Sequence, residues 1–260
     1  RGSIEKYRTL LIFITGMPTK PFHGFSSALR AHIRNGESQL ALHLYEEILQ
    51  IKKSHSHLNP ASFVSLLRAC AELKDSQKGY TLHSDIARKG LLDQNLFVGN
   101  ALLDMYAKSG MLSKAQELFN ELKFRDVVTW NVLIGGYVQH GHGEEGLKCF
   151  EDMQLCGISP NVVTFICSLK ACSIIGATVK GEEIHAEIAN NGLLEKNIVL
   201  ATALVDMYAK CGALSKARIV HNELPVRTVA SWNALIAGYA QEGQNQEALK
   251  CLMQMQSEGI

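Results

Sequence analysis

The sequence predicts an all-α protein, a right-handed α-solenoid superhelix of stacked helix-turn-helix repeats. Three observations support this prediction. The sequence repeats itself after 102 residues, the long repeat divides into units of 36, 31 and 35 residues, and each unit holds two stretches with helical apolar spacing. A helical hairpin of this size cannot bury its apolar faces alone, so neighbouring units must stack into one continuous core.

The 102-residue repeat covers long, nearly identical segments. ALLDMYAKSGMLSKA at 101–115 returns as ALVDMYAKCGALSKA at 203–217. VVTWNVLIGGYVQHG at 127–141 returns as VASWNALIAGYAQEG at 229–243. When residues 60–158 are aligned with the second copy, 46 of 99 positions are identical. Chance would give only a handful of identities, so the two segments are copies of one long internal repeat.

The repeat defines seven units. A looser copy precedes the two long copies, and the last unit is cut short at the end of the chain. The expected units are 22–59, 60–95, 96–126, 127–161, 162–197, 198–228 and 229–260. Residues 1–21 are expected to form an N-terminal segment, in which Arg1-Gly2-Ser3 resembles a cloning remnant followed by part of a helix.

The unit 127–161 illustrates the two expected helices. Gly141 ends the first helix and Pro160 lies beyond the second, because glycine supplies a left-handed cap and proline cannot continue a helix. Trp130 and its counterpart Trp232 are expected to be packing residues. The expected core residues are Leu133, Ile134 and Tyr137 in the first helix, and Leu147, Phe150 and Met153 in the second.

Composition narrows the function classes. The chain is 47% hydrophobic and 20% charged, with 26 basic and 25 acidic residues, so net charge does not indicate a strongly basic nucleic-acid binder. The seven cysteines include no CxxC pair, which predicts buried, reduced thiols rather than disulfides or a zinc ribbon. No apolar run is long enough to cross a bilayer, and no signal or transit peptide is recognisable.

The repeated segments resemble the pentatricopeptide repeat family of plants, and its subclass with alternating unit lengths. VVTWNVLIGGYVQHG resembles the 35-residue P motif, and ALLDMYAKSG resembles the short S motif. SLLRACAEL and its copy, each followed by a KG…H…GLL segment, resemble the long L motif. The order is P-L-S-P-L-S-P. The resemblance implies sequence-selective binding of single-stranded RNA in a mitochondrion or chloroplast, commonly to mark cytidines for editing, together with other editing-factor subunits.

The resemblance also implies which residues read the RNA, one base per repeat. The family reads each base through the fifth residue of a motif and the last residue before the next motif. The implied pairs are Ser26/Asn59, Asn100/Asp126, Asn131/Asn161 and Thr202/Thr228, with Asn233 alone in the last unit. L units offer weaker pairs with apolar fifth residues, Val64/Asn95 and Ile166/Asn197. The second residue of a motif lies beside the base, which implicates His23, Phe97, Val128, Val199 and Ala230.

The chemistry of these residues suggests which bases they prefer. Asp126 only accepts hydrogen bonds, so it suits the N3–H of uracil, whereas Asn161 can donate to the N3 lone pair of cytosine. Small hydroxyl residues such as Thr202 leave room for a purine. The implied 5′→3′ preference is A–n–U–C–n–purine–pyrimidine. The competing explanation for these Asn and Asp residues is helix capping or turn formation.

Two other function classes compete with RNA binding. A tetratricopeptide-like scaffold would bind peptides, but its Trp-Leu-Gly-Tyr pattern is missing and the unit lengths here are unequal. An enzyme is not expected, because no nucleophile is paired with a base. His185-Ala186-Glu187 matches the HxE of zinc deaminases, but no PCxxC follows it. We therefore expect no catalytic residue, cofactor, metal, membrane contact or small-molecule substrate.

Overall fold

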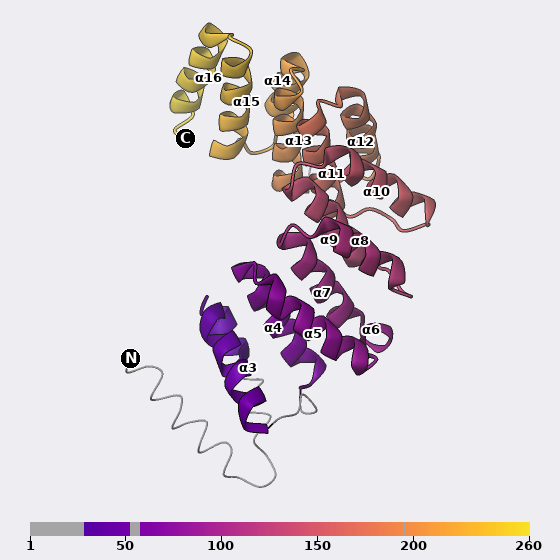
Figure 1. Ribbon diagram of the computed structural model, residues 1–260. Coiled ribbons are helices and arrows are strands. Elements are labelled where there is room, and N and C mark those ends of the chain that lie inside the picture. The colour runs from indigo at the N-terminus through magenta and orange to yellow at the C-terminus, as the bar shows by residue number, and fades with distance from the viewer. Residues whose placement is uncertain (1–28, 53–57, 195) are drawn as a thin grey trace, which may run out of the picture. The chain divides into compact units, whose positions relative to one another are not determined.

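The computed structural model describes residues 29–52, 58–194 and 196–260 (Figure 1). These residues are helical and contain no strand, which confirms the predicted all-α class. A helical segment at 29–34 comes first. The helices that follow are α3 (Ser38–Lys52), α4 (Pro60–Leu73), α5 (Ser76–Arg88), α6 (Leu91–Gln94), α7 (Leu96–Lys108), α8 (Leu112–Glu121), α9 (Val127–Gln139), α10 (Gly143–Leu155), α11 (Val162–Ile175), α12 (Thr178–Asn190), α13 (Ile198–Lys210), α14 (Leu214–Glu223), α15 (Val229–Gln241) and α16 (Asn245–Ser257).

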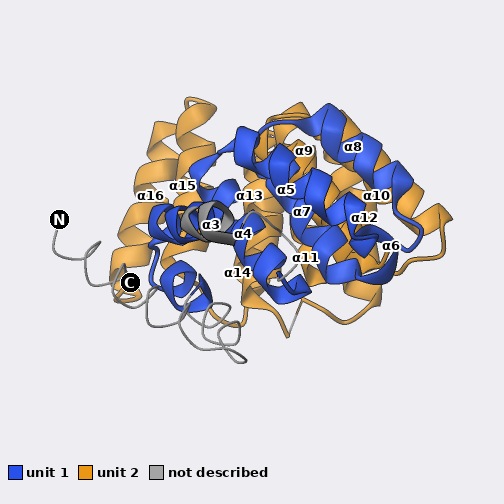
Figure 2. Cartoon of the chain, turned by 60° about the horizontal axis from the view of Figure 1, so that its bottom comes forward, with its two compact units in different colours: residues 1–124 blue, residues 125–260 orange. Residues whose placement is uncertain are grey.

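The helices form two compact units, residues 1–124 and 125–260 (Figure 2). In the second unit the odd-numbered helices α9, α11, α13 and α15 pack in sequence and form one layer, and each is followed by its own partner helix. In the first unit α4 packs on α7 in the same manner, with α5 and α8 as the partners. We call α4, α7, α9, α11, α13 and α15 the first helices. Each begins where the sequence repeat begins a new unit.

Local signals explain where the helices begin and end. An Asn, Asp or Thr precedes each first helix and accepts a hydrogen bond from a backbone N–H in the first turn. After α11, Gly176 adopts the left-handed conformation with φ of 66°. Lys74 occupies the same place after α4 with φ of 53°, although left-handed backbone disfavours a side chain. The cap geometry is therefore kept even where glycine is missing.

The expected core residues are buried, with one exception. Leu133, Ile134 and Met153 are fully buried, and Trp130 and Trp232 are 5% and 0% exposed, which confirms them as packing residues. Tyr137 is only half-buried and packs edge-on against His142 in the turn before α10.

All seven cysteines are free thiols, as expected from the sequence. Burial raises the pKa of Cys70, Cys149 and Cys172 to about 12, so these thiols stay protonated at neutral pH. Burial was not predicted correctly for three cysteines: Cys167 and Cys211 are half-buried, and Cys156, which follows the last turn of α10, is exposed. None of the described helices is long and apolar enough to cross a bilayer.

Candidate nucleic-acid interface

The fifth and last residues of the units lie together at the start of the first helices. Each fifth residue is in the second turn, and each last residue in the described ranges is the N-cap of the next first helix. The N-caps are Asn59, Asn95, Asp126, Asn161, Asn197 and Thr228. The capping explanation is therefore correct for all six. It does not compete with base contacts at the asparagines, because a cap bond uses the side-chain oxygen and leaves the amide nitrogen.

Asn131 and Asn161 are joined by hydrogen bonds within the second unit. Nδ2 of Asn131 donates to Oδ1 of Asn161 at 3.1 Å, and the backbone N–H of Thr164 donates to the same oxygen at 3.1 Å. The hydroxyl of Thr164, which is fully buried, donates to Oδ1 of Asn131 at 2.7 Å. Both side-chain carbonyl oxygens are therefore held by groups of the protein.

This network determines which groups the pair presents. An amide oxygen has two lone pairs, and those of Asn161 are both used. Nδ2 of Asn161 donates to no described residue, and the side chain is exposed. The pair thus offers N–H donors, which suits a base edge with acceptors, such as N3 and O2 of cytosine.

Asn100 and Asp126 are placed differently. Asn100, in α7 of the first unit, is only 9% exposed, and a buried amide requires hydrogen-bond partners. Asp126, before α9 in the second unit, is half-buried and forms a capping box with Thr129. Its Oδ1 accepts from the backbone N–H of Thr129 at 2.9 Å. Asn100 is the most buried of the described polar readers that the sequence predicts.

The remaining predicted pairs are less connected. Thr202 is half-buried in α13, and Thr228 forms a capping box with Ser231. Asn233 is exposed in α15. Asn59 is exposed and accepts from the backbone N–H of Ser62 at 2.9 Å, whereas its predicted partner Ser26 lies outside the described residues.

The L-type pairs combine a half-buried apolar residue with a cap. Val64 and Ile166 are half-buried in α4 and α11. Oδ1 of Asn95 accepts from the backbone N–H of Val98 at 3.2 Å, and Oδ1 of Asn197 accepts from that of Leu200 at 2.9 Å. Apolar fifth residues have no group that can form a hydrogen bond with a base edge.

Exposed apolar side chains lie beside the predicted readers. Phe97 is 80% exposed, Val128 is 49% exposed and Val199 is 65% exposed. Ala230 is exposed as well, and His23 lies outside the described residues. Val163, at the same place in its unit, is 53% exposed and was missed from the sequence although its register would have identified it. Exposed apolar side chains thus recur at the second place of the repeat.

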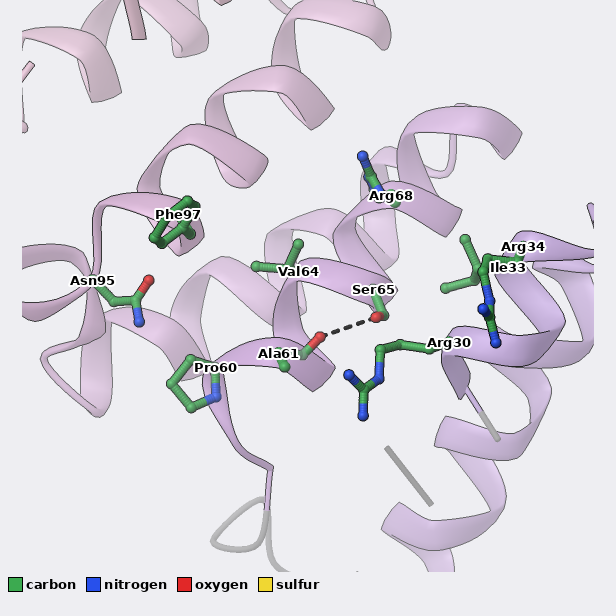
Figure 3. Close-up of a pocket in the computed structure, with 10 residues that line it drawn as sticks. All are labelled: Arg30, Ile33, Arg34, Pro60, Ala61, Val64, Ser65, Arg68, Asn95 and Phe97. Atoms are coloured by element: carbon green, nitrogen blue, oxygen red, sulfur yellow. Dashed lines mark hydrogen bonds between the residues drawn. The ribbon is translucent and has the colours of Figure 1, made fainter. Parts of the chain in front are cut away.

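Basic residues that the sequence did not single out line two hollows in the first-helix layers. A hollow of about 750 Å³ in the first unit is lined by Arg30, Arg34 and Arg68 together with Val64 and Phe97 (Figure 3). Figure 3 shows Val64 and Arg68 on one helix, with Phe97 on one neighbouring helix and Arg30 and Arg34 on the other.

A second hollow lies in the second unit. It measures about 610 Å³ and is lined by Lys170 of α11 and by Asp206 and Lys210 of α13. The predicted readers Val64 and Asn95 line the hollow of the first unit.

The motifs that resembled catalytic sites have structural roles. Nδ1 of His185 is hydrogen-bonded to the hydroxyl of Tyr208 at 2.9 Å, and His83 repeats this contact with Tyr106 at 2.7 Å. Burial lowers the pKa of both histidines, so they are neutral at pH 7. In the described part of the chain, no group of three or more His, Cys, Asp or Glu residues could hold a metal ion.

Comparisons with known proteins identify the family of these repeats. The PPR repeat family matches residues 125–173, and the PPR repeat matches residues 100–127 and 230–260. A mitochondrial pentatricopeptide repeat-containing protein of Arabidopsis thaliana is 38% identical over 236 residues, which cover 91% of this chain and 22% of that protein. A chloroplastic relative from the same plant is 34% identical over 245 residues, which cover 94% of this chain and 39% of that protein.

A solved structure shares the fold. The crystal structure of the pentatricopeptide repeat protein PPR10 in complex with an 18-nt psaJ RNA element matches 99% of this chain and 37% of that chain. The TM-score is 0.79 at 22% sequence identity. This chain spans about a fifth to two-fifths of the length of the two relatives described above. With its unit register, its helix pairs and its relatives in agreement, the chain belongs to the pentatricopeptide repeat family.

Proposed function

We propose that this chain binds single-stranded RNA sequence-selectively, one base per repeat, as the target-recognition part of an organellar RNA editing or processing factor. The observation that carries the proposal is the Asn131–Asn161–Thr164 network, which holds the side-chain oxygens of two amides and leaves Nδ2 of Asn161 available at the start of α11. A capping box alone would need no bond from the Thr164 hydroxyl to Asn131 of the preceding repeat. An oriented donor pair beside exposed apolar side chains is what base recognition requires.

The relatives support the same function. PPR10 was crystallised with an RNA element, and its fold matches nearly the whole of this chain. The names of the relatives place some of them in mitochondria and others in chloroplasts, so this protein is expected to act in one of these organelles. The family assignment decides against the tetratricopeptide alternative. The 36–31–35 alternation of unit lengths supports the subclass with P, L and S motifs.

The proposed preference is A–n–U–C–n–purine–pyrimidine in the 5′→3′ direction. The Asn131/Asn161 pair supports cytosine at the fourth slot, because its available groups are donors. Binding rather than catalysis is the expected role of the chain, and the editing or processing chemistry would then come from other parts of the factor or from other subunits.

Selection from a random RNA pool tests the proposal directly. The chain should enrich sequences that contain U–C at the third and fourth slots, with an unconstrained fifth slot. A pool that shows no enrichment, or enrichment of duplex RNA, would contradict sequence-selective recognition of single strands. Titration of a matched DNA strand is the control, since loss of the 2′-hydroxyl should weaken binding.

A further inference from the structure

The two L units combine an apolar fifth residue with a cation one helical turn later. In α4 these residues are Val64 and Arg68, and in α11 they are Ile166 and Lys170. Residues four apart lie on the same helix face, separated by about one turn of 5.4 Å. Both cations are exposed, whereas both apolar residues are half-buried. The L units therefore present a positive charge at the face where other units present hydrogen-bonding groups to a base.

The same place is acidic in the S units and neutral in two of the three P units. The S units carry Asp104 and Asp206 there, and the P units carry Arg30, Gly135 and Ala237. Both L units therefore have a cation at this place, which they share with Arg30 of the first P unit.

The cations of the L units are also more available to a bound anion than those of the S units. The S units carry Lys108 and Lys210 on their first helices, but each is paired with an aspartate of its own helix at 2.8 Å. Arg68 and Lys170 have no carboxylate within 4 Å among the described residues. A cation that is already paired has less to gain from an added anion than one that is not.

The hollows around the two cations are suited to an anion. In the first unit, Arg68 shares the hollow with Arg30 and Arg34, and none of the described residues that line it is acidic (Figure 3). In the second unit, Lys170 shares the hollow with Lys210, and Asp206 is the one acidic residue among the described residues that line it; Asp206 is paired with Lys210. Guanidinium and ammonium groups in such settings bind phosphate oxygens.

We infer that Arg68 and Lys170 bind phosphodiester groups of the RNA backbone, so that the L units anchor the strand at slots where their fifth residues read no base. This inference rests on the proposed function. Phosphate contacts fix the register and orientation of a nucleic acid without reading its sequence. Anchors on both sides of the Asn131/Asn161 pair would hold the bases of the intervening slots against their readers.

The salt dependence of binding tests the assignment. Arg68→Gln and Lys170→Gln should each lower the slope of log K against log[salt] by about 0.7, the value for one phosphate contact on a single strand, and the double variant by about 1.4. At 0.1 M salt each change should weaken binding about fivefold for every RNA sequence alike. The base preferences at the P and S slots should stay the same, because the readers are unchanged.

A matched control is Lys148→Gln. Lys148 is exposed on the second helix α10 and belongs to neither hollow, so its loss should leave the slope nearly unchanged. RNAs with one neutral methylphosphonate linkage provide a second measurement that needs no variant. A neutral linkage at an L slot should weaken binding by the wild-type chain about fivefold, and this effect should disappear in the corresponding Gln variant.

The possible outcomes separate the two proposals. If the wild-type chain binds no single-stranded RNA selectively, the proposed function fails and the anchoring role fails with it. If the chain binds selectively but the Gln variants keep the wild-type slope and the full methylphosphonate effect, only the anchoring role is overturned.

Discussion

Asn161→Asp exchanges one available amide donor for an acceptor and leaves the surrounding hydrogen bonds in place. Oδ1 of Asn161 accepts from the backbone N–H of Thr164 and from Nδ2 of Asn131, each at 3.1 Å, and a carboxylate oxygen can accept both bonds. The second oxygen would replace the Nδ2 group, which donates to no described residue. The outward-facing atom then suits the N3–H of uracil and repels the lone pair of cytosine N3.

The size of the effect follows from this exchange of one contact. Base-edge contacts discriminate by about 1–3 kcal/mol, so the ratio of uracil to cytosine affinity at the fourth slot should rise about tenfold or more. Asp and Asn are equivalent N-caps, and a negative charge at the N-terminus of α11 is favourable, so the free energy of unfolding should change by less than about 0.5 kcal/mol. A specificity change without a stability change is therefore expected.

The assay titrates both proteins against RNAs that differ only at the fourth slot, and records thermal unfolding of each protein in parallel. Thr164→Val is the matched control for orientation, because it removes the hydroxyl that donates to Oδ1 of Asn131 at 2.7 Å and keeps the side-chain shape. This control should weaken the preference for cytosine without creating one for uracil. An unchanged uracil-to-cytosine ratio in Asn161→Asp, with binding intact, would refute the assignment of Asn161 as a base reader.

Three further predictions concern other positions. Asp126→Asn should raise the ratio of cytosine to uracil affinity at the third slot by about tenfold or more and leave the other slots unchanged. Titration against RNAs that differ only at that slot measures this ratio. Altered stability with unaltered base choice would show that Asp126 acts as an N-cap alone. Burial and the nearby Arg227 and Arg218 lower the pKa of His221 to about 4, and neither of its buried ring nitrogens has a hydrogen-bond partner among the described residues. The unfolded state therefore binds more protons between pH 6.5 and 4, and the free energy of unfolding should fall by about 2 kcal/mol from pH 7 to pH 5. Urea unfolding should show that His221→Phe removes about this much of the pH dependence, and an equal dependence in the variant would contradict it. Lys74→Gly should raise the free energy of unfolding by about 0.5–1 kcal/mol, because a left-handed backbone conformation is unfavourable for a residue with a Cβ. A lower melting temperature of the variant would contradict this explanation.

The positions of the predicted readers at the helix starts could be predicted because repeat proteins use local signals. The N-cap residues Asn161 and Thr228 mark both the end of one unit and the start of the next first helix, so the unit boundaries coincide with helix boundaries. The second-residue positions Phe97 and Val199 could be placed on the surface from register alone. Register also predicts Val163, which is exposed at the same place.

Other features could not be predicted because they depend on contacts between different helices. His221 is the repeat counterpart of Phe119, but only the structure shows its ring 4.2 Å from that of Trp232, with no hydrogen-bond partner for its nitrogens among the described residues. Asn100 was predicted as a base reader, and the structure shows that it is only 9% exposed. Burial of this kind is set by the packing of neighbouring helices, which periodicity within one helix does not report.

The sequence by itself determined the all-α class, the order of the units and the first residue of each first helix, because period and capping are properties of short segments. Only the tertiary structure decided which atoms of Asn131 and Asn161 remain available, since their orientation depends on Thr164 in the next unit. It also decided that, within the described part of the chain, Arg68 and Lys170 have no carboxylate partner while Lys108 and Lys210 have one. The physical reason is that hydrogen bonds and ion pairs act over a few ångströms, and only packing brings residues of different helices within that range.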